Sequence, residues 1–295
     1  MRLVESGELS KRAAQAQHLI GECRLCPHAC GAKRIDGEVG HCRTGVDPVV
    51  SSFGPHFGEE SPLVGQHGSG TIFFAHCNLC CTFCQNADIS QLSEGSIIAT
   101  EQLAEIMVSL QDRGCQNLNF VTPTHQVPQI LCALLLAVKQ GLTIPLVYNC
   151  GGYESVETLQ LLESIFDIYM PDCKYSDDAV AERFSGASNY WAHNRAALRE
   201  MHRQVGDLVM NEQGVAVRGL LVRHLVLPNG LAGTGQVMGF LASLSKETYV
   251  NVMAQYRPCF QAHRHPELAR SLSVQEYEQA LQLALDAGLQ RLDQR

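Results

Sequence analysis

The thirteen cysteines of this sequence are its most direct sign of chemistry. Eight of them lie in two short groups, which are Cys23, Cys26, Cys30 and Cys42, then Cys77, Cys80, Cys81 and Cys84. In a reducing compartment, thiols that gather in this way hold a metal ion or an iron–sulfur cluster rather than form disulfides. The other five are scattered and are expected to be small buried apolar residues: Cys115, Cys132, Cys150, Cys173 and Cys259.

The overall composition excludes several classes of function, and the lack of a signal-peptide core favours a reducing compartment. The 295 residues are 45% hydrophobic and 18% charged, which is typical of a globular chain with a large core. The net charge of -8, without any run rich in Lys or Arg, argues against a nucleic-acid partner. No apolar stretch reaches the length of a membrane span, and residues 1–9 lack a signal-peptide core. We therefore expect a soluble, cytoplasmic protein without a membrane partner.

The second cysteine group has the spacing of a catalytic iron–sulfur site. Cys77, Cys81 and Cys84 can each hold one iron of a [4Fe–4S] cluster, which leaves the remaining iron open to a ligand. Cys80 is an alternative ligand, so the choice of Cys77, Cys81 and Cys84 as the three ligands is one interpretation of the spacing. A zinc site made by all four cysteines is the other interpretation, although adjacent cysteines rarely both bind one tetrahedral ion.

The chain beyond residue 70 alternates short apolar runs with amphipathic stretches, which predicts strands that alternate with helices. Six such units in succession indicate a parallel sheet. Because six units are fewer than the eight of a closed barrel, we expect an α/β fold with a partial (β/α)6 barrel of the TIM type. The predicted strands are residues 71–76, 117–121, 144–148, 166–170, 219–227 and 248–253.

Helix signals separate these strands. Thr100 and Ser155 are expected to cap two helices, and Ser273 to form a capping box with Glu276. Other helices are predicted at residues 10–20, 128–140, 189–205 and 235–245. The chain before residue 67 shows little periodicity, so we divide it into an N-terminal Cys-rich extension (1–66) and a barrel domain (67–295).

Polar side chains follow the predicted strands at the end where parallel barrels carry their active sites. They are Thr122, Thr124 and His125 after the second strand, Asn149 and the pair Gly151-Gly152 after the third, Asp172 and Lys174 after the fourth, and Arg223 in the fifth. An arginine in an apolar strand requires an anionic partner, which favours a ligand site. A surface histidine, a plain glycine turn and a structural ion pair are the alternatives.

The spacing Cys77-x3-Cys81-x2-Cys84, with Phe83 before the last cysteine, resembles the cluster motif of the radical S-adenosylmethionine (SAM) superfamily. Residues 68–79 and 83–86 are similar to one branch of this superfamily, the homologues of the pyruvate formate-lyase activating enzyme. The sequence departs from that branch at Cys80, where the branch usually has a polar residue. The resemblance spans residues 55–260. It implies that the open iron binds the amino and carboxylate groups of SAM, and that one electron cleaves the sulfonium bond to give a 5′-deoxyadenosyl radical.

The same resemblance implies roles for the residues at the strand ends. The loop of residues 122–125 replaces a Gly-rich turn that receives the SAM amino group. Asp172 and Lys174 match an Asp-x-Lys pair that lies near SAM. Arg223 is expected to face the SAM carboxylate or ribose, and Leu225 to pack on the adenine where the family has a valine.

The first cysteine group precedes the barrel and lies among turn-forming residues, as a metal knuckle requires. Cys23, Cys26, Cys30 and Cys42 are interpreted as ligands of a structural zinc ion or of a second iron–sulfur cluster, which the spacing does not distinguish. Four free thiols are the alternative. Residues 57–60 (Phe-Gly-Glu-Glu) either line the substrate side or form a solvated loop.

These observations predict a radical SAM oxidoreductase that abstracts a hydrogen atom. The expected partners are SAM, an electron donor such as a flavodoxin or ferredoxin and, by resemblance, a glycyl-radical enzyme whose backbone glycine is the substrate. Modification of another small molecule or protein is the alternative within this chemistry. The competing class is an iron–sulfur electron-transfer or scaffold protein without SAM chemistry, which has no use for polar groups at the strand ends.

Overall fold

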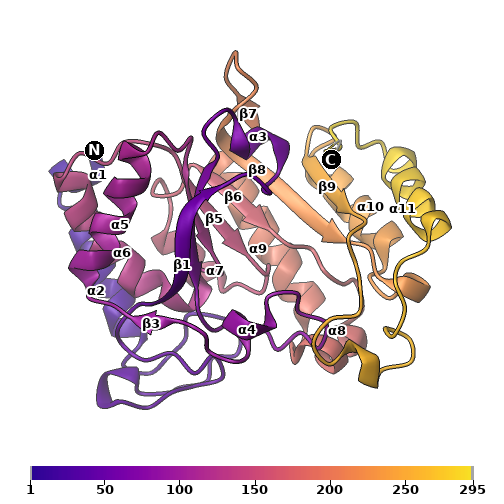
Figure 1. Cartoon of the computed structure of the whole chain (residues 1–295), viewed down its shortest axis with the longest axis horizontal. Helices are drawn as coiled ribbons and strands as arrows, with labels where there is room; N and C mark the ends of the chain where they lie inside the picture. Colours follow the sequence, from indigo (N-terminus) through magenta and orange to yellow (C-terminus); the bar gives the residue numbers. More distant parts are fainter. Residues whose placement is uncertain (1, 294–295) are drawn as a thin grey trace.

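Six short apolar runs form parallel strands in the computed structural model, which describes residues 2–293 (Figure 1). Along the sheet they follow one another in chain order, and each is followed by at least one helix. The predicted α/β fold with a partial TIM-type barrel is confirmed. The strands are β2 (Ser69–Phe74), β4 (Leu118–Val121), β5 (Leu146–Cys150), β6 (Ile168–Pro171), β8 (Ala216–Leu225) and β9 (Tyr249–Met253).

Three further strands, none of them predicted, pair with this sheet in antiparallel fashion: β1 (Val49–His56), β3 (Ser96–Ile97) and β7 (Val209–Met210). Residues 49–56, which we assigned to the extension, therefore belong to the barrel sheet. Gly54 and Pro55 obscured this strand, because both residues are unfavourable in strand interiors. Pro55 is accommodated because β3 pairs only with Val49 and Val50, which leaves one edge of β1 free beyond them.

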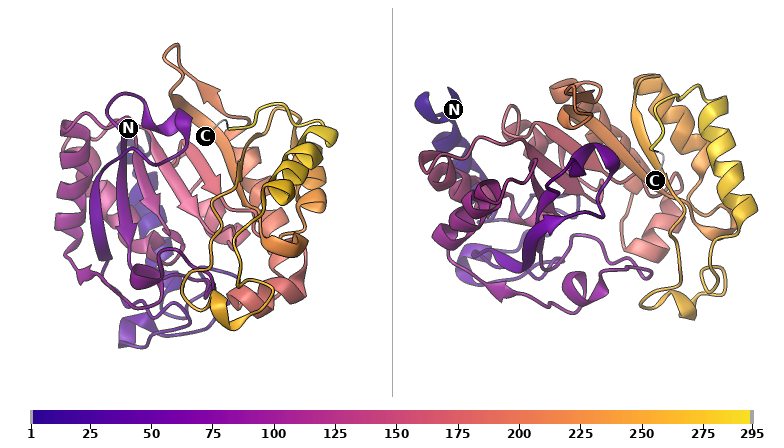
Figure 2. Two further views of the ribbon diagram at one scale, coloured as in Figure 1. Left: turned by 45° about the vertical axis from the view of Figure 1, so that its right-hand side comes forward. Right: turned by 45° about the horizontal axis from the view of Figure 1, so that its top comes forward.

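The long helices lie on the outer face of the curved sheet, with α10 and α11 together beside β9 (Figure 2), whereas the short α3 and α4 lie at its two ends (Figure 1). Their bounds are α1 (Arg2–Glu5), α2 (Glu8–Leu19), α3 (Ser61–Val64), α4 (Ala87–Ser90), α5 (Thr100–Asp112), α6 (Val127–Lys139), α7 (Val156–Leu161), α8 (Asp178–Ser185), α9 (Tyr190–Val205), α10 (Thr234–Leu244) and α11 (Val274–Asp286). None of the described helices is long and apolar enough to cross a bilayer.

The predicted helix caps have mixed outcomes. The capping box of Ser273 and Glu276 at the start of α11 is confirmed. The predicted cap at Thr100 is wrong, because Ala99 occupies that position and the Gln102 side chain accepts a hydrogen bond from the Ala99 backbone amide (2.9 Å). Ser155 stands at the N-cap of α7, but its side chain makes no capping hydrogen bond.

Alternation along the strands divides the core into an outer layer and a barrel interior. Phe120 and Tyr148 belong to the large apolar core between the sheet and the helices, whereas Val147 and Met170 belong to a smaller cluster on the opposite face of the sheet. Leu63 of α3 joins that interior cluster. The site therefore has a packed layer on either side of the strands that position it.

Candidate active site

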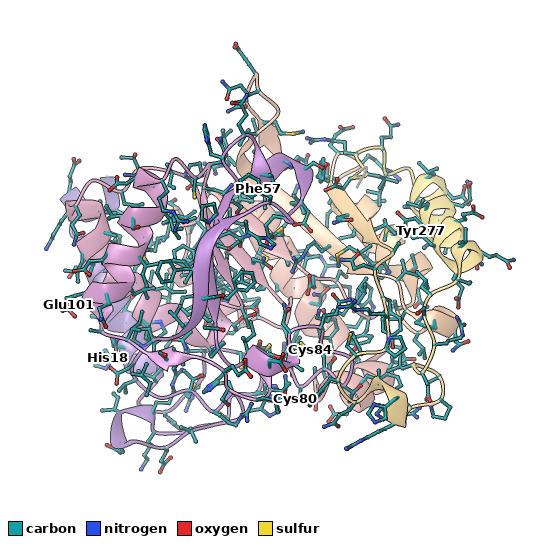
Figure 3. All side chains as sticks on the ribbon, in the orientation of Figure 1. His18, Phe57, Cys80, Cys84, Glu101 and Tyr277 are labelled. Carbon is teal, nitrogen blue, oxygen red and sulfur yellow. The ribbon has the colours of Figure 1, made fainter. Side chains whose placement is uncertain are left out.

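The second cysteine group forms the loop between β2 and α4, at the carboxyl end of the parallel strands (Figure 3). Three of its thiols accept or share hydrogen bonds from neighbouring groups. The Leu79 amide donates to the Cys77 sulfur (3.3 Å), the Ser185 hydroxyl donates to Cys81 (3.0 Å), and Ser90 lies 3.2 Å from Cys84. Hydrogen bonds to sulfur are characteristic of iron–sulfur ligands, whose reduction potential they adjust.

Backbone contacts hold this loop from two sides. The amides of Cys80 and Thr82 donate to the carbonyls of Ser185 and Phe184 at the end of α8 (2.9 and 2.8 Å). On the other side, the Gln261 amide donates to the Thr82 carbonyl (2.8 Å). The loop therefore has a defined conformation before any cofactor binds.

Phe83 anchors the same loop in a second apolar core. Its ring makes edge contacts with Tyr175 and Tyr256, at centroid distances of 6.4 and 5.9 Å. The half-buried Cys77 and Cys84 pack against this core. An aromatic residue before the last cysteine thus fixes the loop on the barrel.

The electrostatics of the three thiols agree with iron ligation. Burial is the main cause that raises the pKa of Cys81 to about 11 and the pKa of Cys77 well above its usual range, and neighbouring thiolates act in the same direction. Lys174 acts in the opposite direction on both thiols. Ionisation of Cys77 and Cys81 thus requires additional positive charge, which the irons of a [4Fe–4S] cluster would supply. The donor set therefore fits this cofactor.

Cys80 points away from the other three thiols of the loop. It is exposed, and its sulfur lies 3.3 Å from Nε2 of His41 in the N-terminal extension. Among the described residues, no three His, Cys, Asp or Glu side chains converge as ligands of a single metal ion. The placement of Cys80 supports the register Cys77, Cys81 and Cys84 for the cluster.

An ion network lies at the carboxyl ends of β5, β6 and β8. Asp172 accepts from Lys174 Nζ (2.5 Å) and from Arg223 Nε (2.8 Å), and Asn149 Oδ1 accepts from Arg223 Nη2 (2.7 Å). The structure thus brings together four of the residues that the sequence singled out. Asp172 and Lys174 do share one side of the strand end, as their spacing predicts.

The charges of this network depend on one another. Burial alone would raise the pKa of Asp172, but Arg223 and Lys174 outweigh it and hold the pKa below its usual range. Burial opposes the charged form of Lys174 as well, whereas Asp172 and Cys81 raise its pKa. All three groups are therefore ionised at neutral pH, and the two cations share the Asp172 carboxylate.

Two residues expected at the mouth of the barrel are instead buried. Thr124 donates its hydroxyl to Glu154 Oε1 (2.7 Å), and neither Thr124 nor His125 has more than 2% of its surface exposed. His125 Nε2 bonds the Ala75 carbonyl (2.8 Å), and burial lowers the pKa of its imidazole to about 3. Sequence spacing placed these side chains at the strand end but did not reveal that they turn inward toward polar partners.

Glu154 is a buried acid that the sequence analysis did not single out. Besides Thr124, the Tyr148 hydroxyl donates to its second oxygen (3.0 Å). Burial raises the pKa of Glu154 to about 7, although hydrogen bonds from Thr124, Tyr148 and Cys150 lower it. An acidic residue directly after a Gly-Gly turn at a strand end was the signal available in the sequence.

The raised pKa of Glu154 makes stability depend on pH. The unfolded carboxyl ionises near pH 4.5, so between about pH 4.5 and 7 the folded state holds a proton that the unfolded state has released. Stability is therefore expected to fall by about 2–4 kcal/mol as pH rises through this window. Urea titrations at several pH values measure this slope. Glu154→Gln, which cannot ionise, should remove most of it; an unchanged slope would mean that other groups cause it.

The remaining predicted residues have defined positions. Thr122 adopts a positive φ of 59°, and its amide donates to the Asn149 carbonyl (2.8 Å), so it connects the ends of β4 and β5. Leu225 is half-buried against the core that holds the cysteine loop. Gly152 is needed for close packing, because a Cβ there would lie 2.0 Å from the Asp172 carbonyl oxygen.

Residues on α9 support these strand ends, and the sequence analysis missed them. Tyr190 accepts from the Lys174 amide (3.0 Å), and Asn194 donates to the carbonyls of Gly152 (2.9 Å) and Asp172 (3.0 Å). Both side chains are buried. In the sequence, the available signal for Tyr190 and Asn194 was a polar side chain at a core position of a helix.

The segment of residues 57–60 contributes buried acids rather than a solvated loop. Glu60 lies 3.9 Å from Arg223 Nε and accepts from Asn251 (3.1 Å). Burial raises its pKa, while Arg223 lowers it. Phe57 is 58% exposed and lies at the end of the molecule opposite Cys80 and Cys84 (Figure 3).

The loops of the extension that follow α2 lie at the bottom of Figure 1, and they contact the cysteine loop directly. His28 Nε2 bonds the Asn78 carbonyl (2.8 Å) and its ring stacks on His41 at 3.7 Å. The Gly31 amide donates to the Cys23 carbonyl (3.1 Å), and Gly40, two residues before Cys42, lies against the Cys30 sulfur. The four cysteines of the first group thus lie in one region of the extension.

Comparison with known proteins agrees with this geometry. The profile of a 4Fe-4S single cluster domain family matches residues 65–219, more than half of the chain. An uncharacterised protein of Methanocaldococcus jannaschii is 33% identical over 294 residues, which cover 96% of this chain and 80% of that protein. The chain belongs to this 4Fe-4S single cluster domain family.

Solved structures show the same fold at low identity. A radical SAM methyltransferase from Sphaerobacter thermophilus is 13% identical with a TM-score of 0.50, over 77% of this chain and 67% of that one. The FeFe-hydrogenase maturase from Carboxydothermus hydrogenoformans is 12% identical with a TM-score of 0.53, over 75% of this chain. The matched region spans 51% of that maturase. The matched family is that of a 4Fe-4S single cluster domain, and the fold is the one that these solved structures share.

Proposed function

We propose that this protein is a radical SAM enzyme that binds SAM between the cysteine loop and the Asp172–Lys174–Arg223 network, and that it abstracts a hydrogen atom from a backbone glycine of a partner protein. The bound cluster and SAM supply the electron transfer that yields a 5′-deoxyadenosyl radical. Cys77, Cys81 and Cys84 are the proposed cluster ligands. The sequence similarity to homologues of the pyruvate formate-lyase activating enzyme supports the glycine substrate.

The position of Lys174 carries the proposal for SAM. It donates to Asp172, and a Cβ built at Gly151 would lie 2.7 Å from Leu79 of the cysteine loop and 3.9 Å from the Lys174 side chain, so Lys174 lies beside this loop. Lys174 shares the Asp172 carboxylate with Arg223, whereas Arg223 also has Glu60 at 3.9 Å. A carboxylate of SAM would give Lys174 a second anionic partner, because partly buried cations are stabilised by an anionic partner.

The other residues of the site have supporting roles in this proposal. Asn149 and Asp172 fix the plane of the Arg223 guanidinium, which leaves Arg223 oriented toward a ligand. Leu225, two residues further on β8, offers an apolar surface on the same side of the strand. The Thr124 side chain is not part of the proposed SAM site, because its hydroxyl is committed to Glu154.

The open sheet is compatible with a protein substrate. Within residues 2–293 no strand pairing joins β9 to β1 or β2, so the barrel is not closed by backbone hydrogen bonds on this side. A loop that carries a glycine needs more access than a small molecule does. Another small molecule or protein as the substrate is the second candidate.

Lys174→Met tests the SAM site. The variant retains most of the aliphatic side chain but removes the ammonium group, so the affinity for SAM should fall about tenfold to a hundredfold. Equilibrium dialysis of the anaerobically reconstituted protein with labelled SAM measures this change. Lys139→Met, on the last turn of α6 and remote from the site, is the matched control. Unchanged SAM affinity in Lys174→Met would remove Lys174 from the site.

The substrate requires a separate measurement. The reduced enzyme, SAM and a purified glycyl-radical enzyme are incubated anaerobically, and the electron paramagnetic resonance spectrum is recorded. A glycyl radical signal supports the proposed substrate. 5′-Deoxyadenosine without a glycyl radical supports another substrate, and the absence of both SAM cleavage and SAM binding supports an electron carrier.

A further inference from the structure

Asn119 is a polar side chain inside the barrel that the proposed SAM site does not use. Its neighbours in β4, Leu118 and Phe120, belong to the core between the sheet and the helices, so Asn119 faces the barrel interior. The side chain is fully buried, and within residues 2–293 neither the oxygen nor the nitrogen of its amide has a hydrogen-bond partner. An unpaired buried amide is costly, and a ligand that brings one donor and one acceptor would complete it.

Asn117, just before β4, shows how a buried amide is paired in the same region. Its nitrogen donates to the Leu63 carbonyl (2.8 Å), and its oxygen accepts from the Ser69 hydroxyl (2.6 Å). Asn117 is as deeply buried as Asn119. The unpaired amide is therefore a property of Asn119 and not of every polar residue at this end of the barrel.

Glu60 is a second polar group with a free atom in the barrel interior. Its Oε1 accepts from Asn251 Nδ2 (3.1 Å) and lies 3.9 Å from Arg223 Nε. Both of those side chains face inward, since Val222 and Val250, which precede them, belong to the outer core. Glu60 is only 5% exposed, and its Oε2 has no hydrogen-bond partner in the described part of the chain.

The position of Glu60 is fixed, and it lies where a large ligand can enter. The Glu60 carbonyl accepts from the amide of Leu63, whose side chain is fully buried in the interior cluster. The contact between Glu60 and Asn251 joins the loop after β1 to β9. This is the side of the barrel on which no strand pairing among the described residues joins β9 to β1 or β2.

The charges around Glu60 favour a neutral hydrogen-bond donor over a cation. Arg223 lies near two carboxylates, Asp172 at 2.8 Å and Glu60 at 3.9 Å, and Lys174 also pairs with Asp172. The two cations and the two carboxylates thus balance. An ionised carboxylate only accepts hydrogen bonds, whereas an amide side chain both donates and accepts. A peptide backbone supplies the complement of both, because each of its units has one N–H and one C=O.

From these contacts we infer that Glu60 and Asn119 bind the backbone of the protein substrate. Glu60 Oε2 accepts the N–H of the glycine, and the Asn119 amide pairs with a neighbouring peptide unit. This role rests on the proposed function and names the groups that recognise its substrate. Both residues are expected to contribute to the affinity for the substrate and not to the cleavage of SAM.

Peptide affinity tests the role of Glu60. The probe is a fluorescent peptide with blocked ends and one central glycine, added to the cofactor-loaded chain with SAM but without a reductant, so that SAM is not cleaved. Glu60→Gln should weaken binding about tenfold, as expected for a lost hydrogen bond to a charged group. N-methylation of the glycine removes the same N–H, so it should weaken binding to the wild-type chain and add little in Glu60→Gln. Glu59→Gln, in the same loop beside His56, is the matched control.

The SAM affinity of the same variants separates the two sites. Arg223 retains Asp172 and Asn149 in Glu60→Gln, so SAM binding should be nearly unchanged. Equal weakening of SAM and peptide would assign Glu60 to the SAM site and overturn the inference. Peptide binding that Glu60→Gln retains would overturn it while the proposed function stands. A wild-type chain that cleaves SAM but binds no peptide would overturn the glycine substrate as well.

The melting temperature tests Asn119 without any ligand. Leucine has nearly the shape of asparagine but no polar atom, so Asn119→Leu should melt about 2–4 °C higher in the cofactor-free protein. The same variant should bind the peptide about tenfold more weakly. Asn117→Leu, the matched control, loses two hydrogen bonds and should melt at a lower temperature. A lower melting temperature in Asn119→Leu, or an unchanged peptide affinity, would show that Asn119 serves the fold instead.

Discussion

Replacing Cys77, Cys81 or Cys84 with Ala is expected to reduce the formation of 5′-deoxyadenosine from SAM to the level without enzyme. Each thiolate holds a different iron in the proposed site, so the loss of one leaves an iron without its protein ligand. Serine is a poor substitute, because iron–sulfur clusters are held by thiolates. The reconstituted and reduced variants are assayed with SAM by chromatography, and the iron content should fall by about four per chain.

Cys80→Ala is the decisive control for the register. The Cys80 sulfur is exposed and contacts His41, so its removal should leave most of the SAM cleavage and the iron content intact. Cys259→Ala, outside both cysteine groups, controls for the general loss of a thiol. If Cys80→Ala loses the cluster while Cys81→Ala retains it, the third ligand is Cys80 and not Cys81.

Asp172→Ala should lower the free energy of unfolding by about 3 kcal/mol, the largest stability effect expected at the site. The substitution leaves Lys174 and Arg223 close together, with only Glu60 as a distant carboxylate at 3.9 Å from Arg223. Both cations are mostly buried, with side-chain exposures of 17% and 20%. Urea denaturation of the cofactor-free protein measures the change.

A double variant distinguishes charge from packing in this network. Asp172→Ala with Lys174→Met removes one of the two unpaired cations and should recover at least about 1 kcal/mol relative to Asp172→Ala alone. The pH dependence has a defined sign. Because the folded pKa of Asp172 is lowered, its contribution is present above the unfolded value of about 3.9 and is lost as pH falls through the folded pKa. No recovery in the double variant would assign the loss to packing.

Spacing and periodicity were sufficient to predict the parallel strands of the fold and to identify the cluster motif. Buried parallel strands are apolar on both faces, so each appears as a local run that depends little on distant residues. The six predicted strands correspond to β2, β4, β5, β6, β8 and β9. β1 was missed because a partly exposed strand with Gly54 and Pro55 has no such local pattern, and only its pairing with β2 defines it.

The sequence by itself placed Asn149, Asp172, Lys174 and Arg223 at neighbouring strand ends, because parallel strands end at the same edge of a sheet. It did not determine which way a side chain turns after a strand ends, since loop backbone is not periodic. Only the tertiary structure decided that Thr124 binds Glu154 and that Cys80 faces His41. Those contacts join residues far apart in the chain, and burial determines their partners through the high cost of leaving polar and charged groups unpaired.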